Sequence, residues 1–277
     1  MKRVLRAAAL LCVVLVTAFA IDCARHKATG AGPWRIEQSR APRVTIHDGA
    51  VVVHDARRFV WRGENEFDAA WTDATYDLGK LDRCALYVVP LNASGSIAHA
   101  FVSFGFGPDD WLAVSVEARR KPGVDYRIWG ALRHHYELMY VIGDERDVVG
   151  KRAWGEKSTV YCYPVKVSVA ALRRFFLATM NRAEEVAANP ESYGMFTNTC
   201  ATNVVLNAQR AGSAVRLNLD ILLSGRVDRL AYTMGVLDTD LSFEDAREAA
   251  RVDEKLRALH DSWPAGFAGV VHRPLTR

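Results

Sequence analysis

One cysteine at the start of a sequence-predicted helix has the setting of a nucleophile. Cys200 follows the polar, turn-prone run 197–199 and opens an apolar pattern at helical spacing that Gly212 ends. Asn198 or Thr199 can cap this helix. A thiol there lies among free backbone N–H groups at the positive end of the helix dipole, which favours the reactive thiolate. The alternative is a buried cysteine that only packs the helix start, and the residues around Cys200 do not decide between the two.

A histidine that could serve as the base lies on a sequence-predicted β-hairpin. Residues 97–106 and 111–119 alternate in polarity on either side of a Gly-Pro-Asp-Asp turn. A hairpin centred near Pro108 places His99 across from Glu117 on one face, with Ser115 beside them as a second orienting group. A carboxylate partner would fix the imidazole tautomer and raise its basicity. The alternative is an ordinary cross-strand pair on a solvated face, and a register slip of one residue would turn Glu117 away.

The N-terminus has the features of an export signal. Lys2, Arg3 and Arg6 precede an uncharged apolar run that ends near the small-x-small site 18–20. Residues 1–21 are therefore interpreted as a signal peptide or membrane anchor; the run is short for a spanning helix, which slightly favours cleavage. Residues 22–43 are expected to form a linker and residues 44–277 a single domain.

Charge and cysteine content exclude some functions and leave others open. Loss of the three basic residues with the signal lowers the formal net charge from +4 to +1, so the composition predicts no nucleic-acid partner. No Cys-x-x-Cys or His-Glu-x-x-His motif is present, and we expect neither a metal nor a cofactor. Cys84 and Cys162 lie in strand-like runs and are a candidate disulfide for an oxidising compartment, which would leave Cys200 free.

The remaining pattern predicts an α+β fold in which an antiparallel sheet packs on helices. Residues 66–76 have apolar residues at helical intervals, Ser168 caps a long helix that ends near Ala188, and residues 217–259 read as a helical C-terminal extension. The hairpin with the base precedes the helix with the nucleophile, which is the reverse of the order in papain. A circular permutation would preserve the geometry, because a triad is defined by roles and not by chain order.

Several motifs resemble the Lnb N-terminal periplasmic domain family of bacterial envelope proteins. They are residues 97–104, 112–119, 136–141, 144–149, 198–200, 222–232 and 237–239. The resemblance runs in order from about Asp77 to near His272. It implies a circularly permuted papain-like (NlpC/P60-like) fold in the periplasm, close to the inner membrane, with His99 and Cys200 as the catalytic pair. The family takes its name from lipoprotein N-acyltransferases, so the resemblance implies a phospholipid or lipoprotein substrate.

The resemblance also has one departure at the site. The family commonly has Asn directly before the cysteine, whereas this chain has Thr199 there and Asn198 one place earlier. Asn198, Thr199 and the backbone of Ala201 are thus the expected oxyanion or pocket residues, with Cys200, His99, Glu117 and Ser115 as catalytic residues. We therefore expect a membrane-associated periplasmic thiol enzyme that acts on an acyl group, by acyl transfer like that of a lipoprotein or lipid N-acyltransferase. The alternatives are a cell-wall peptide or lipid hydrolase of the same fold and a non-catalytic envelope assembly or binding protein. The sequence leaves the oligomeric state open.

Overall fold

The computed structural model describes residues 2–217, 221, 224–259 and 267–276. Within these residues, the centre of the protein is a nine-stranded sheet in the order β1-β2-β9-β8-β7-β6-β10, with β5 paired to β2 and β11 to β9. Every pairing is antiparallel except the short parallel contact between β2 and β9. The strands are β1 (Arg43–His47), β2 (Ala50–Arg57), β5 (Trp71–Asp77), β6 (Arg83–Pro90), β7 (Ala98–Gly105), β8 (Trp111–Arg119), β9 (Tyr136–Asp144), β10 (Tyr161–Pro164) and β11 (Ser192–Tyr193), while β3 (Val60–Trp61) and β4 (Phe67–Asp68) form a separate pair.

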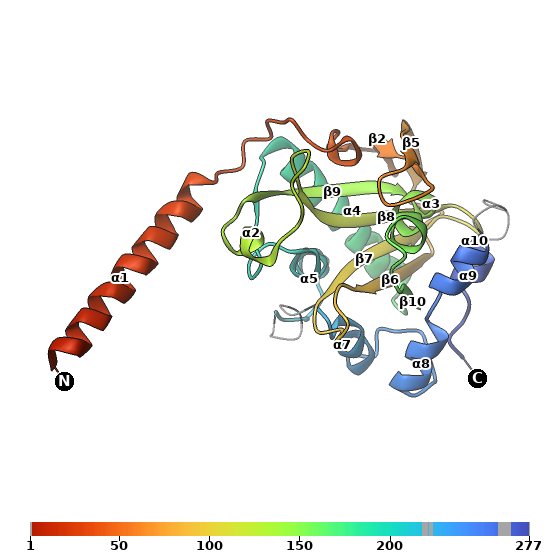
Figure 1. The fold of residues 1–277 in the computed structure, drawn as a ribbon. Helices are drawn as coiled ribbons and strands as arrows, with labels where there is room; N and C mark the ends of the chain where they lie inside the picture. Colours follow the sequence, from red (N-terminus) through yellow and green to blue (C-terminus); the bar gives the residue numbers. More distant parts are fainter. Residues whose placement is uncertain (1, 218–220, 222–223, 260–266, 277) are drawn as a thin grey trace.

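Helices cover both faces of this sheet (Figure 1). The helical elements are α1 (Lys2–Arg25), η1 (Ile36–Gln38), α2 (Ile128–Leu132), α3 (Glu145–Gly150), the π-helical turn η2 (Lys151–Gly155), α4 (Val169–Ala188), α5 (Cys200–Arg210), α7 (Val227–Thr233), α8 (Phe243–Ala249), α9 (Asp253–Ala258) and α10 (Phe267–Val271). On one face α4 packs Leu172, Phe176 and Met180 into the main core, and α5 lies beside it. On the other face α3, η2 and α9 enclose a second core. The α+β class and the helix capped by Ser168 are therefore confirmed.

The β7–β8 hairpin has the register that the sequence predicts. Val102 pairs with Val114 and Gly105 with Trp111, and continuation of this register sets position 99 opposite position 117. Val102, Phe104 and Val114 belong to the main core, whereas Phe101 and Ala113 belong to the second. The paired ladder ends at Val102 and Val114, so the outer halves of these strands are available to neighbours other than each other.

The expectation for residues 66–76, a short amphipathic helix or turn, is wrong. Residues 66–76 contain strands β4 and β5, and β5 forms an antiparallel ladder with β2 in which Tyr76 pairs with Val51. The helical interpretation depended on a short match at Phe67, Ala70 and Trp71. Aromatic and β-branched residues such as Trp71 and Thr75 suit a pleated surface, and the free edge of β2 supplies the partner.

The structure also contradicts the candidate disulfide. Cys84 and Cys162 are both free thiols, and they lie in adjacent strands β6 and β10. Cys162 pairs with Tyr87, three residues from Cys84, and the two thiols belong to different cores on opposite faces of the sheet. Cysteine side chains that point to opposite faces cannot form a disulfide without a change in the backbone.

The apolar N-terminal segment forms helix α1, which projects away from the rest of the chain (Figure 1). Its length and composition suit a membrane span, and no part of its most apolar stretch is buried by the protein. The following residues lie against the domain: Gln38 is buried, and Arg119 donates to the carbonyl oxygens of Gln38 and Ser39. The chain between α1 and the sheet is therefore held along the edge of the domain.

Candidate active site

Cys200 is the first residue of α5, and a capping box fixes its position. Thr199 is the N-cap: its side chain accepts from the N–H of Thr202, whose hydroxyl accepts from the N–H of Thr199 in return. The thiol thus lies in the first turn, where the backbone N–H groups have no acceptor within the helix. It is 4% exposed. The predicted helix start is confirmed, with Thr199 as its cap.

Helix α5 packs against β7 and brings Cys200 to His99. The imidazole interacts with the thiol on one side, while on the other its Nε2 lies 2.7 Å from the Ser115 hydroxyl oxygen. Ser115 donates in turn to Glu117 Oε1 at 2.7 Å, and His99 Nε2 is 3.4 Å from the same oxygen. The hairpin therefore supplies a chain of contacts from the imidazole through the hydroxyl to the carboxylate. Both predicted orienting residues take part.

A buried arginine completes this chain. Arg152, from the π-helical turn η2, donates to Glu117 and also holds Glu156. Burial opposes ionisation of Glu117, but the charge of Arg152, followed by that of His99, outweighs this effect and keeps the pKa of the carboxyl well below its usual range. The Glu117 carboxyl is consequently ionised at neutral pH, next to His99.

The charges of the site favour a thiolate and an imidazolium. Burial works against the charged form of each group. For His99, the negative charge of Glu117 outweighs burial and raises the pKa to about 9. For Cys200, the charge of His99, a hydrogen bond from that ring and a hydrogen bond from the backbone N–H of Ala100 lower the pKa of the thiol below its ordinary value. The pair is thus poised as an activated nucleophile and a proton donor.

The thiol opens onto a cavity of about 270 Å³. Cys200, His99 and Glu117 line this cavity together with both charged and apolar side chains. The lining includes Arg35, Glu37, Glu64, Leu91, Ile97, Arg120, Tyr126, Ile128, Lys151, Glu156, Tyr193, Met195, Thr199 and Ser224. A small substrate group can therefore reach the sulfur without displacement of the core.

Residues 67–233 match the model of the Lnb N-terminal periplasmic domain family. This match spans more than half of the chain and includes Cys200, His99, Ser115, Glu117 and Arg152. The chain belongs to this family. No curated protein and no solved structure matches it at a significant level. The family places the protein in the periplasm, and the apolar helix α1 is compatible with export or with attachment to the membrane.

In this Lnb-family chain, the three residues expected at the oxyanion pocket, Asn198, Thr199 and Ala201, have different contacts. The Asn198 amide donates to Glu191 and to the Ser192 carbonyl, and its oxygen accepts from Asn203. Thr199 lines the cavity, but its N–H is used by the capping box. The Ala201 methyl packs away in a small apolar cluster with Val205 and Ile221. The groups left to face a reacting carbonyl are the backbone N–H groups of the first turn.

Sequence reasoning missed three residues of the site. Arg152 comes from a turn without periodicity, and the only available signal was that a buried Glu117 requires a cation. Tyr126 and Tyr193 also line the cavity. Burial, and then the nearby charge of Cys200, raises the pKa of Tyr193 well above its ordinary value, and the pKa of Tyr126 is raised for similar reasons. Both hydroxyls therefore stay protonated and can donate hydrogen bonds near the sulfur.

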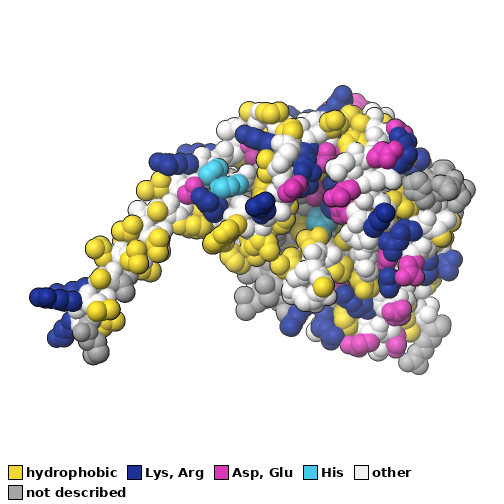
Figure 2. Space-filling view, viewed as in Figure 1, with side chains coloured by type: hydrophobic (Ala, Val, Ile, Leu, Met, Phe, Trp, Pro, Cys, Tyr) yellow, Lys and Arg dark blue, Asp and Glu magenta, His cyan; other side chains and the backbone are white. Residues whose placement is uncertain are grey.

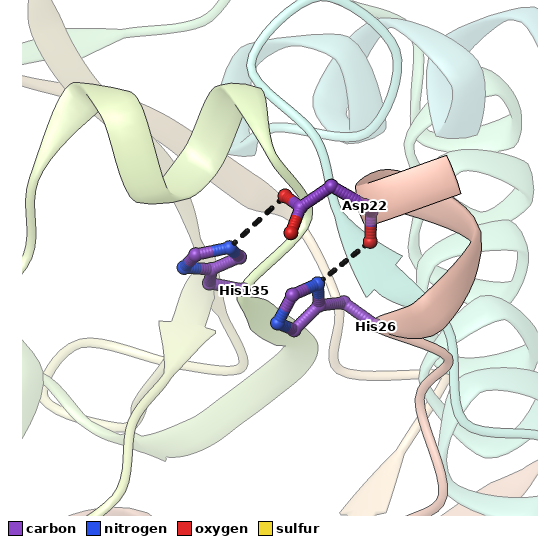
Figure 3. A group of neighbouring side chains, drawn as sticks. All are labelled: Asp22, His26 and His135. Atoms are coloured by element: carbon purple, nitrogen blue, oxygen red, sulfur yellow. Dashed lines mark hydrogen bonds and ion pairs between the residues drawn. The ribbon is translucent and has the colours of Figure 1, made fainter. Parts of the chain in front are cut away.

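One group of side chains outside the cavity could hold a metal ion. Asp22, His26 and His135 each offer a ligand atom, and these atoms lie within 4.8 Å of one another (Figure 3). Arg133 already donates to the Asp22 carboxylate at 2.7 Å, and His26 Nδ1 contacts the Asp22 carbonyl oxygen at 2.8 Å. An arginine on the carboxylate opposes a cation there, so these contacts are better explained as the junction between α1 and the domain.

Proposed function

We propose that this protein is a periplasmic cysteine enzyme that transfers an acyl group, most closely in the manner of a lipoprotein or lipid N-acyltransferase. The observation that carries the proposal is the chain Cys200, His99, Ser115, Glu117 and Arg152, with a lowered thiol pKa and a raised imidazole pKa beside a cavity. Perturbed groups that meet in a cavity are typical of an active site.

In the proposed reaction the Cys200 thiolate attacks the carbonyl carbon of an ester or amide. Backbone N–H groups of the first turn of α5 stabilise the oxyanion, and Tyr193 lines the same cavity. His99 gives its proton to the leaving oxygen or nitrogen as the C–O or C–N bond breaks, which leaves a thioester on Cys200. Neutral His99 then takes a proton from the incoming nucleophile, whose attack releases the thiolate.

The nature of the second nucleophile separates two activities. An amine of a lipoprotein makes the protein a transferase, and water makes it a hydrolase. Hydrolysis of a cell-wall peptide or lipid is the alternative. The charged cavity residues Glu64, Lys151 and Glu156 favour the more polar of these substrates, a cell-wall peptide. Neither activity requires a metal or a cofactor in this scheme.

The arrangement supports a permuted papain-like fold. In papain-like enzymes the nucleophile begins a helix that packs on an antiparallel sheet, and the base lies on a neighbouring strand. Here α5 and β7 have that relationship, but β7 comes first in the chain. The roles of the residues are preserved while the order is reversed.

The proposal is tested by trapping the acyl intermediate. The full chain in detergent or vesicles is mixed with a diacyl phospholipid or a lipopeptide, quenched in acid, and analysed by mass spectrometry of the peptide that contains Cys200. We expect an acyl adduct that neutral hydroxylamine removes, as it does for thioesters. Cys200→Ser should carry a hydroxylamine-resistant ester or no adduct, whereas Cys162→Ser should behave as the wild type.

The products then identify the reaction class. An N-acylated peptide amine indicates transfer, and free fatty acid or cleaved peptide indicates hydrolysis. A chain that forms no adduct with ester, lipopeptide or cell-wall peptide, and whose Cys200→Ala variant retains its cellular role, would be the non-catalytic assembly or binding protein.

A further inference from the structure

Helix α1 leaves the domain at a defined place, beside α2. Asp22 pairs with Arg133 just after α2, and the Cys23 thiol contacts the carbonyl oxygen of Leu132, the last residue of that helix. The backbone N–H groups of Thr29 and Gly30 donate to Glu137, and Ser192 donates to the carbonyl oxygen of His26. Figure 3 shows Asp22 and His26 facing His135 at this junction. A bilayer around α1 would therefore lie against the side of the domain that carries α2.

That side carries exposed apolar side chains. Trp129 is 68% exposed and Ile128 is 49% exposed, both in α2, and Phe196 is 53% exposed in the loop before α5. Leu91 is half exposed at the turn after β6. Figure 2 shows apolar side chains on the face of the domain beside the base of α1. We call the set Leu91, Val124, Tyr126, Ile128, Trp129 and Phe196 the apolar rim.

The apolar rim is continuous with the lining of the active-site cavity. Leu91, Tyr126 and Ile128 belong both to this rim and to the lining of the cavity. Exposed cations, Lys121 and Arg127, lie in the same segment as Trp129. Aromatic and apolar residues interspersed with Lys and Arg are typical of surfaces that lie at the boundary between lipid headgroups and acyl chains.

The orientation of α1 agrees with this surface. An α-helix of 24 residues is about 36 Å long and can cross a hydrocarbon core of about 30 Å. Its basic end, with Lys2, Arg3 and Arg6, is expected on the cytoplasmic side, which puts the domain outside. The C-terminal end of α1 then lies at the membrane surface, and α2, which contacts this end of α1, lies at the same level.

We propose that the apolar rim inserts into the periplasmic leaflet of the membrane, so that the cavity opens at the level of the lipid headgroups. The occupant of this surface is the bilayer and not a second protein. Trp129 and Ile128 enter the acyl region, while Lys121 and Arg127 contact anionic headgroups. This placement holds whether or not Cys200 is a nucleophile, and it can therefore fail independently of the proposed reaction.

Tryptophan quenching by brominated lipid tests the placement directly, because α1 contains no tryptophan. The full chain is reconstituted in vesicles of phosphatidylethanolamine and phosphatidylglycerol, with and without bromine on the acyl chains. We expect brominated lipid to quench the wild type and Trp129→Phe to lose at least half of the quenched signal. The matched control is Trp71→Phe on β5, which should retain the quenched signal of the wild type.

Two results would overturn the placement. One is a quenched fraction that Trp129→Phe leaves unchanged. The other is the absence of lipid quenching together with a Trp129-dependent dimer in sedimentation, which would show that the rim binds a second copy. Circular dichroism of Trp129→Phe checks its folding, which we expect to be unaffected because the side chain is mostly in solvent.

Discussion

Among the described residues, a cysteine, a histidine and a glutamate meet at two places beside this sheet, and the electrostatics of the two groups differ. The first is Cys200, His99 and Glu117. In the second, Cys162 Sγ lies 3.9 Å from His272 Nδ1, and His272 Nε2 lies 2.8 Å from Glu145 Oε2. The same three residue types thus meet twice, with a His–Glu distance of 3.4 Å in the first group and 2.8 Å in the second.

The surroundings of the two thiols are opposite. Cys162 is in strand β10, is 1% exposed and belongs to the second core, where His272 stacks on Trp111 at 3.4 Å between ring centroids. Burial, followed by the charge of Glu145, raises the pKa of Cys162 well above its ordinary value. The pKa of Cys200 is lowered in spite of its burial.

The difference shows what a triad needs besides its three residues. Cys200 is the first residue of a helix, its sulfur accepts a hydrogen bond from the backbone of β7, and it lines the cavity. The Glu117 carboxylate is paired with the Arg152 guanidinium. The charge of Glu117 therefore raises the pKa of His99 more than it opposes the thiolate of Cys200. At Cys162 the charge of Glu145 adds to the cost of a thiolate in the core.

The largest predicted effect is the contrast in alkylation between these two cysteines. We expect iodoacetamide to label Cys200 at least about 10³-fold faster than Cys162 in the folded protein, because Cys162 becomes accessible only when the core opens at a cost of several kcal/mol. Mass spectrometry locates the label, and in urea the two rates should converge. Comparable rates in the native state would remove the distinction between the groups.

Replacement of His99 and replacement of His272 should have different effects on the labelling of Cys200. In His99→Ala the thiol of Cys200 loses the imidazolium but stays buried, so its pKa rises and the pH profile of labelling moves upward. Each unit of the shift lowers the thiolate fraction about tenfold at pH values below the wild-type pKa. His272→Ala should leave the Cys200 profile unchanged. An unmoved profile in His99→Ala would mean that the two residues do not form a pair.

The stability of the protein should depend on the protonation of His99. Its pKa rises on folding from 6.5 to about 9. The contribution of His99 to stability is therefore fully present below pH 6.5 and is lost as the pH rises through about 9, up to about 3 kcal/mol. The lowered pKa of Cys200 contributes with the opposite pH dependence and offsets part of this loss. Denaturant unfolding between pH 6 and 10 measures the slope. His99→Gln should flatten it, and His47→Gln, at an exposed site, should not.

The smallest predicted effect is at Ser115. Ser115→Ala removes the hydroxyl between His99 and Glu117, but the ion pair at 3.4 Å remains. We expect a loss of about 1 kcal/mol, seen as an approximately fivefold slower labelling of Cys200 near neutral pH. Ser103→Ala is the matched control: Ser103 is also buried on the hairpin, and its hydroxyl has no hydrogen-bond partner among the described residues. Equal effects in the two variants would exclude Ser115 from the chain of contacts.

Local rules predicted the parts of the site that depend on local geometry. The turn at Pro108 and strict alternation determined the register that sets His99 opposite Glu117. The Thr199 cap placed Cys200 at the start of its helix. Each of these features depends on residues within about twenty positions of one another.

The parts that the sequence did not predict depend on distant contacts. Arg152 reaches Glu117 from η2, and β5 forms because β2 offers an edge. Cys84 and Cys162 lie on opposite faces because of the register between β6 and β10, and no local pattern specifies that register. The contacts of His272 depend on the return of the C-terminal segment to the sheet.

The hydrogen bond from the Ala100 N–H to Cys200 has a consequence for how this site can change. The donor belongs to the main chain, so every residue except proline at position 100 supplies it. Loss of any one side chain around the sulfur therefore leaves part of its activation in place. Replacement of Glu117, Ser115 or Arg152 therefore leaves this main-chain hydrogen bond to the Cys200 sulfur in place.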